Sequence, residues 1–239
     1  MKPAPGWLEA LPADRLLAEF SLWSADLGRL AEDIARVERH VDIFHVDVAD
    51  GHFSPALLYF PDLTAAVRKV TAKPIHVHLM TTDDILLDQI DQFAEAGADL
   101  ISIHAENANA DAALARIREH GLATGMVLQL HTPVAAAEPF LDRLDMLTLL
   151  GTLIGIKGVG LDDSALARLR EARKLIADYL NDDLAGRRII LASDGGNREH
   201  TVPNLRLAGA ETIVMGSLAF GAPDLAARIA WVHGLEREP

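Results

Sequence analysis

Short apolar runs alternate with segments of helical periodicity along almost the whole chain. The runs have the length and β-branched content of buried strands, and the segments between them repeat apolar residues at the spacing of amphipathic helices. Eight strands are expected, at 19–22, 42–48, 74–79, 99–103, 123–128, 145–150, 187–192 and 212–215. Helices are expected at 26–38, 61–72, 83–96, 107–119, 162–181, 198–207 and 223–234, with a weaker one near 134–141.

The connections are short, and Gly97 and Gly209 stand where a helix should stop before a strand. A doubly wound open sheet has similar alternation, but eight units and no G-x-G-x-x-G after the first strand favour a closed barrel. We therefore predict an α/β protein with one (β/α)8 TIM-barrel domain over residues 19–239. Leucines at roughly helical spacing predict a short N-terminal helical extension over 1–18, which caps the barrel bottom or packs on a neighbour.

Composition limits the classes of function. Half of the 239 residues are apolar and 5% are aromatic, which suits the aliphatic core of a buried parallel sheet. A net charge of −13 without any basic cluster argues against nucleic acid as a partner. The chain has no cysteine, so thiolate ligands and disulfides are excluded. With no export signal or membrane-spanning run at its start, a cytoplasmic protein without membrane association is expected.

Ionisable residues fall at the carboxyl ends of three expected strands. His45 and Asp47 stand two apart, so their side chains share the lumenal face, and His78 and Asp194 occupy matching positions on the third and seventh strands. Catalytic groups of TIM barrels lie at this end. Each residue alone has an ordinary structural explanation, but unpaired charge converging on an apolar barrel mouth is costly. Two His and two Asp suit Zn²⁺, Fe²⁺, Mn²⁺ or Co²⁺.

His76 shares the lumenal face with His78 but lies deeper. For this residue a satisfied interior histidine is favoured over a metal ligand.

Glycine-rich turns indicate a phosphate site. Backbone N–H groups at 195–196 and at Gly216-Ser217 follow the seventh and eighth strands, where TIM barrels often bind phosphate near a helix N-terminus. A further glycine-rich loop at 155–160 is positioned to close over a ligand. Lys157 in this loop offers one more phosphate contact, although loop lysines are usually only solvated.

At these residues the sequence resembles the ribulose-phosphate 3-epimerase family, from about residue 20 to residue 225. Several motifs of the family have counterparts in order. S-L-W-S-A-D at 21–26 resembles its S-I-L-S-A-D, and H-V-D-V-A-D-G-H-F at 45–53 is similar to its H-x-D-V-M-D-x-x-[FY]. H-L-M at 78–80 and D-G-G at 194–196 match its motifs, and A-G-A-E through G-S at 208–217 resembles its A-G-A-D…G-S.

The resemblance implies a metal-dependent isomerase that epimerises C3 of a ketose phosphate, such as ribulose 5-phosphate and xylulose 5-phosphate, through a 2,3-enediolate. It implies metal ligation by His45, Asp47, His78 and Asp194, with the two aspartates as acid and base, and association into dimers or hexamers. Together with the glycine-rich turns, it predicts a set of substrate-binding residues. These are Ser24, Met80, Gly155, Lys157, Gly158, Gly196, Asn197, Gly216 and Ser217.

Departures from the family pattern cluster around the expected substrate. Ala49 and Leu150 stand where the family has methionines, His76 stands where it commonly has an acid, and residues 153–159 lack the proline, aromatic and glutamine of its N-P-G-F-G-G-Q loop. Two alternatives therefore stay open: an isomerase or aldolase that acts on a different phosphorylated sugar with the same metal site, and a metal- or phosphate-binding barrel without turnover.

Overall fold

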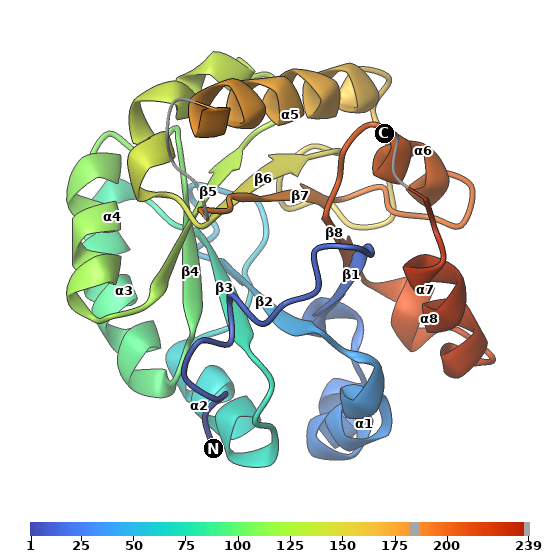
Figure 1. The fold of residues 1–239 in the computed structure, drawn as a ribbon. Helices are drawn as coiled ribbons and strands as arrows, with labels where there is room; N and C mark the ends of the chain where they lie inside the picture. The colour runs from blue at the N-terminus through green and yellow to red at the C-terminus, as the bar shows by residue number, and fades with distance from the viewer. Residues whose placement is uncertain (182–186, 237–239) are drawn as a thin grey trace.

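Eight parallel strands close into a barrel, in the order β1-β2-β3-β4-β5-β6-β7-β8 (Figure 1). The structure is a computed structural model that describes residues 1–181 and 187–236. β1 pairs with both β2 and β8, which closes the ring and confirms the predicted TIM barrel. The strands are β1 (Leu17–Ser21), β2 (Ile43–Ala49), β3 (Ile75–Met80), β4 (Leu100–His104), β5 (Ala123–Leu128), β6 (Met146–Leu150), β7 (Ile190–Asp194) and β8 (Thr212–Met215).

Helices surround the barrel (Figure 1). None of those in the described part of the chain has the length and apolar character needed to span a bilayer. The α-helices are α1 (Leu30–Val37), α2 (Pro61–Val70), α3 (Asp83–Ala96), α4 (Ala110–Glu119), α5 (Ala165–Asn181), α6 (Val202–Leu207), α7 (Ser217–Phe220) and α8 (Leu225–His233). The 3-10 segments are η1 (Leu22–Ser24), η2 (Leu27–Arg29), η3 (Glu38–His40) and η4 (Val134–Arg143).

The weak helix expected near 134–141 is the 3-10 segment η4. Pro139 lies inside it, and a proline cannot donate the backbone hydrogen bond that an α-helix requires there.

Alternation along the strands separates two environments. In β2, Phe44 and Val46 belong to the large apolar core, whereas His45 and Asp47 face the lumen and hydrogen-bond there. Every residue of β2 is buried, because helices cover the outer face of the barrel and side chains from the other strands fill its lumen. The same alternation therefore supplies both the core and the site.

The helix predicted over residues 1–18 is wrong. The segment before β1 contains turns, and β1 itself begins at Leu17. Pro12 and the positive φ of Gly6 interrupt a regular helix, although Ala10 N–H still donates to the Gly6 carbonyl. The capping role is confirmed, since the segment crosses one end of the barrel (Figure 1). Trp7, Leu8 and Leu11 pack there on Leu17, Ile43, Leu100, Met146, Ile190 and Ala192.

Candidate active site

Four ionisable side chains meet at the carboxyl ends of β2, β3 and β7. Each offers one possible ligand atom, and these atoms all lie within 4.8 Å of one another. The parallel register places Asp47 beside His78, and closure of the barrel carries Asp194 to the same place. The residues are His45, Asp47, His78 and Asp194, which are the four that the strand pattern singles out.

The possible ligand atoms of this cluster lie close to one another. His45 Nε2 lies 3.1 Å from Asp47 Oδ1, while His78 Nδ1 lies 3.5 Å from Asp47 Oδ1 and 3.7 Å from Asp194 Oδ2. His78 Nδ1 is buried and has no hydrogen-bond partner among the described residues. A buried imidazole nitrogen without a hydrogen-bond partner, close to two carboxylates, is suited to bind a metal ion. These residues therefore fit a divalent cation.

A chain of hydrogen bonds orients His78. Its Nε2 lies 2.9 Å from His104 Nε2, and His104 Nδ1 lies 3.0 Å from Glu106 Oε2. Burial lowers the pKa of His104 to about 4, so the ring is neutral near pH 7. Because the Glu106 carboxylate accepts the Nδ1 proton of His104, His104 Nε2 accepts from His78 Nε2–H. His78 Nδ1 then directs its lone pair at the two aspartates.

A second network lies deeper in the lumen. Glu19 Oε1 lies 2.6 Å from His45 Nδ1 and 2.5 Å from His76 Nδ1, and His76 Nε2 lies 2.6 Å from Ser102 Oγ. Burial opposes ionisation of Glu19, but His76 and His45 outweigh it and lower its pKa to about 2. Both ring nitrogens of His76 therefore have hydrogen-bond partners, and His76 is a satisfied interior histidine.

The two aspartates of the cluster have opposite pKa shifts. Burial would raise the pKa of Asp47, but His45 and His78 outweigh it and hold that pKa well below the usual range. Ser21 Oγ also donates to Asp47 Oδ2 at 2.8 Å. Burial raises the pKa of Asp194 to about 6, with His45 opposing the rise and Asp47 adding to it. Without a bound cation, Asp194 is thus the more readily protonated of the two carboxylates.

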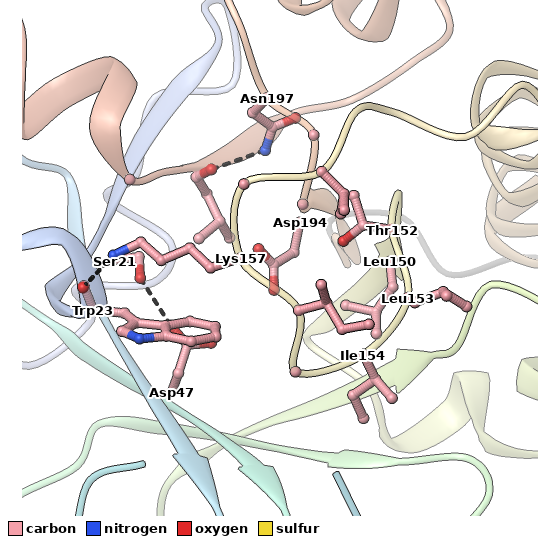
Figure 2. A pocket seen from close by; sticks show the side chains of 18 of the residues that line it. Ser21, Trp23, Asp47, Leu150, Thr152, Leu153, Ile154, Lys157, Asp194 and Asn197 are labelled. Carbon is pink, nitrogen blue, oxygen red and sulfur yellow. Dashed lines mark hydrogen bonds between the residues drawn. The ribbon is translucent and has the colours of Figure 1, made fainter. Parts of the chain in front are cut away.

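A cavity of about 180 Å³ opens above the aspartates. Asp47, Asp194 and the loop after β6 line it, and Figure 2 shows Lys157 of this loop reaching across to Trp23. The structure brings all of the residues predicted to bind substrate to its walls: Ser24, Met80, Gly155, Lys157, Gly158, Gly196, Asn197, Gly216 and Ser217. A substrate in this cavity would therefore touch both the glycine turns and the ionisable cluster.

Two glycines permit the close packing of these walls. Gly196 has φ +72°, and a Cβ there would lie 2.7 Å from the Leu161 Cα. A Cβ on Gly216 would lie 2.6 Å from Ser24 Oγ. Larger residues would push the turns after β7 and β8 apart from their neighbours.

Lys157 connects the loop after β6 to the end of β1. Its Nζ donates to the Trp23 carbonyl at 2.7 Å and lies 5.4 Å from the centroid of the Trp23 ring (Figure 2). The ammonium is therefore held by Trp23, across the cavity mouth, and a phosphate contact from Lys157 stays a prediction.

Sequence reasoning missed several residues of the site. His104 and Glu106 repeat, at the end of β4, the two-residue spacing that singled out His45 and Asp47, so a signal was present. Arg198 follows the D-G-G turn and lines the cavity, and its guanidinium donates to the Asn197 carbonyl at 3.0 Å. Within residues 1–181 and 187–236, no carboxylate forms an ion pair with Arg198.

Comparisons with known proteins agree with this geometry. The model of the "Ribulose-phosphate 3 epimerase family" matches residues 17–220. "Ribulose-phosphate 3-epimerase 1" of Cupriavidus necator is 37% identical over 206 residues, covering 85% of this chain and 84% of the relative. "Ribulose-phosphate 3-epimerase" of Bacillus subtilis is 35% identical over 216 residues, covering 90% and 96%.

Among solved structures, a 3-hexulose-6-phosphate synthase aligns with a TM-score of 0.64 and 20% identity, covering 91% of this chain and 98% of the other. That likeness concerns the barrel fold alone. The family match and the sequence identities together decide the classification: the chain belongs to the ribulose-phosphate 3-epimerase family.

Proposed function

We propose that this protein is a metal-dependent isomerase that epimerises C3 of a ketose phosphate, ribulose 5-phosphate and xylulose 5-phosphate or a related sugar phosphate, through a 2,3-enediolate. The observation that carries the proposal is the pair of carboxylates, Asp47 and Asp194, whose oxygens lie 3.5 and 3.7 Å from His78 Nδ1, an atom without a hydrogen-bond partner among the described residues. Residues 19–239 are the proposed catalytic domain.

His45 through Nε2, His78 through Nδ1, Asp47 and Asp194 are the proposed ligands of a divalent cation. When bound, the cation acts as a Lewis acid toward the negative charge that develops on the substrate oxygens. The mixed imidazole and carboxylate set suits Zn²⁺, Fe²⁺, Mn²⁺ or Co²⁺.

Asp47 and Asp194 are the proposed acid and base. Inversion requires that one carboxylate removes the C3 proton from one face of the sugar and that the other delivers a proton to the opposite face. The different surroundings of the two carboxylates favour such a division, since without a cation Asp194 is more readily protonated than Asp47. The reverse reaction exchanges the two roles, so each residue serves as acid in one direction.

The proposed phosphate site is the turn region of Gly196, Asn197, Gly216 and Ser217, where Arg198 adds a positive charge without a carboxylate partner in the described chain. Ser24, Met80, Gly155, Lys157 and Gly158 are proposed to contact the rest of the sugar phosphate.

A substrate panel tests this function. Tetrulose, pentulose and hexulose phosphates are incubated with the metal-analysed protein in D₂O, and products are identified by NMR. We expect one C3 epimer that carries deuterium at C3. An aldose phosphate would indicate isomerisation and two shorter carbonyl compounds would indicate aldol cleavage. Bound metal without deuterium exchange on any substrate would favour a binding barrel.

We also propose that the chain forms a homo-oligomer, a dimer or hexamer. Leu57 is 81% exposed and Phe60 59% exposed on the segment after β2, and large apolar side chains at such exposure often mark a contact between subunits. Light scattering coupled to size-exclusion chromatography measures the assembly, and a monomer at all concentrations contradicts it.

A further inference from the structure

Glu19 is a fully buried carboxylate at the centre of the barrel. Its Oε1 makes both of the hydrogen bonds to His45 and His76, while its Oε2 has no hydrogen-bond partner among the described residues. Burying a carboxylate with an unpartnered oxygen is costly, and packing alone would be served better by an apolar residue. Its contacts with His45 and His76 therefore indicate a role for Glu19 beyond packing.

The donors and acceptors of this network assign the histidine protons. A carboxylate only accepts, so His45 and His76 each present Nδ1–H to Glu19. A metal-binding His45 is neutral and carries one ring proton, which leaves Nε2 with its lone pair toward Asp47, 3.1 Å from Oδ1. The Glu19 contact therefore selects the ring form in which Nε2 is free to bind a cation.

We propose that Glu19 is a positioning residue that holds His45 with Nδ1 protonated and strengthens Nε2 as a metal ligand. A carboxylate behind a ligating histidine fixes the ring and raises its basicity. Glu19 does this directly for His45, whereas Glu106 acts on His78 through the intervening ring of His104. The inference rests on the proposed metal site.

A narrower explanation is that Glu19 serves only to bind His76. A substitution of Ser102 distinguishes the two explanations, because its hydroxyl contacts His76 Nε2 and is connected to His45 only through His76 and Glu19. Loss of that hydroxyl disturbs His76 while the contact between Glu19 and His45 remains.

The experiment measures the affinity of metal-free wild type, Glu19→Gln and Ser102→Ala for Co²⁺, by chelator competition and by the visible absorption of bound Co²⁺. Gln keeps the shape and one accepting oxygen but removes the negative charge. We expect Glu19→Gln to bind about 10–100-fold more weakly with an altered spectrum. Ser102→Ala should match wild type in both. Equal affinity of Glu19→Gln and wild type, or equal losses in both variants, overturns the inference. A wild type that binds no Co²⁺ overturns the proposed metal site instead.

A second measurement uses the wild-type protein, so it does not depend on whether Glu19→Gln folds. In the Zn²⁺-loaded chain labelled with ¹⁵N-histidine, His45 is assigned by its loss in His45→Asn. We expect a protonated Nδ1 and a zinc-bound Nε2. An unprotonated or zinc-bound Nδ1 contradicts the role of Glu19.

Discussion

Asp47 and Asp194 face one cavity from β2 and β7, but their surroundings differ. Two histidines and Ser21 contact the Asp47 carboxylate, whereas the Asp194 carboxylate lies 3.7 Å from His78 and is influenced electrostatically by its neighbours. This asymmetry suits a pair of residues that pass protons to opposite faces of one intermediate.

Replacement of either aspartate should stop epimerisation. We expect Asp47→Asn and Asp194→Asn each to lower kcat by about a thousandfold or more, because an amide neither removes nor delivers the C3 proton. One variant should still exchange the C3 proton with solvent, which NMR in D₂O detects. Asp50→Asn is the control, since Asp50 accepts hydrogen bonds from the backbone N–H groups of His52, Phe53 and Thr82 and does not line the cavity. Normal turnover in both catalytic variants would contradict the assignment.

Arg198 provides a prediction about the phosphate. Removal of its guanidinium in Arg198→Ala should raise KM about tenfold with a smaller change in kcat, because a hydrogen bond to a charged group contributes about 1.5–3 kcal/mol. Inorganic phosphate should inhibit the wild type competitively and Arg198→Ala more weakly. The control is Arg228→Ala, because Arg228 pairs with exposed Glu199 away from the cavity. An unchanged KM in Arg198→Ala would remove Arg198 from the phosphate site.

At the level of elements, the turn after β7 depends on a backbone conformation that only glycine adopts without strain. Gly196→Ala should lower the free energy of unfolding by about 1–3 kcal/mol and reduce activity, because of the positive φ and the Leu161 backbone. Gly160→Ala is a matched control: apart from its chain neighbours, no described residue has a heavy atom within 4 Å of a Cβ at this position, and its φ is not positive. Denaturant unfolding of both variants measures the difference. Equal stability of the two would show that the turn relaxes.

The sequence pattern locates elements better than it locates their ends. β7 begins at Ile190, not at 187, and α6 begins at Val202, not at 198. Arg187 and Arg188 use their side chains to reach carbonyls of Leu144 and Leu11 before β7 starts. Such tertiary contacts have no signature in the local spacing of apolar residues.

Over the whole molecule, an ion pair ties the N-terminal segment to the barrel. Arg15 donates to both oxygens of Asp42, at 2.8 and 2.7 Å, and to His233 Nε2 of α8 at 2.7 Å. Asp42 also accepts from Ala18 N–H at 2.9 Å. Burial opposes ionisation of Asp42, but the hydrogen bonds from Arg15 outweigh it and hold the pKa well below the usual range.

This pair predicts a pH-dependent stability. Because the folded pKa of Asp42 is below its unfolded value of about 3.9, the stabilisation is complete above that value and is lost as the pH falls toward the folded pKa. Asp42→Asn should cost about 2 kcal/mol at pH 7, and its difference from wild type should narrow on acidification to pH 3. Urea unfolding at both pH values measures it. Asp178→Asn, an exposed partner of Lys174, should change stability little at either pH. If the free energy of unfolding of Asp42→Asn differed from that of wild type by the same amount at pH 7 and pH 3, the prediction would be contradicted.

The cluster of His45, Asp47, His78 and Asp194 could be predicted from the sequence. The spacing of His45 and Asp47 predicts one lumenal face, because strand side chains alternate with a period of two. The ends of the strands then place His78 and Asp194 at the same mouth, as the structure has them.

Other partnerships arise only when the barrel closes. Glu19 meets His45 and His76, which are 26 and 57 residues away, because the stagger of neighbouring strands sets which lumenal side chains share a level. The same applies to Arg198 at the cavity wall and to the turns at residues 5–10 that cap the barrel bottom. Local patterns therefore determined the strand count, the lumenal faces and the four converging residues. The second network and the place of Arg198 in the cavity wall were decided by strand stagger and loop packing, because these join residues that no local spacing relates.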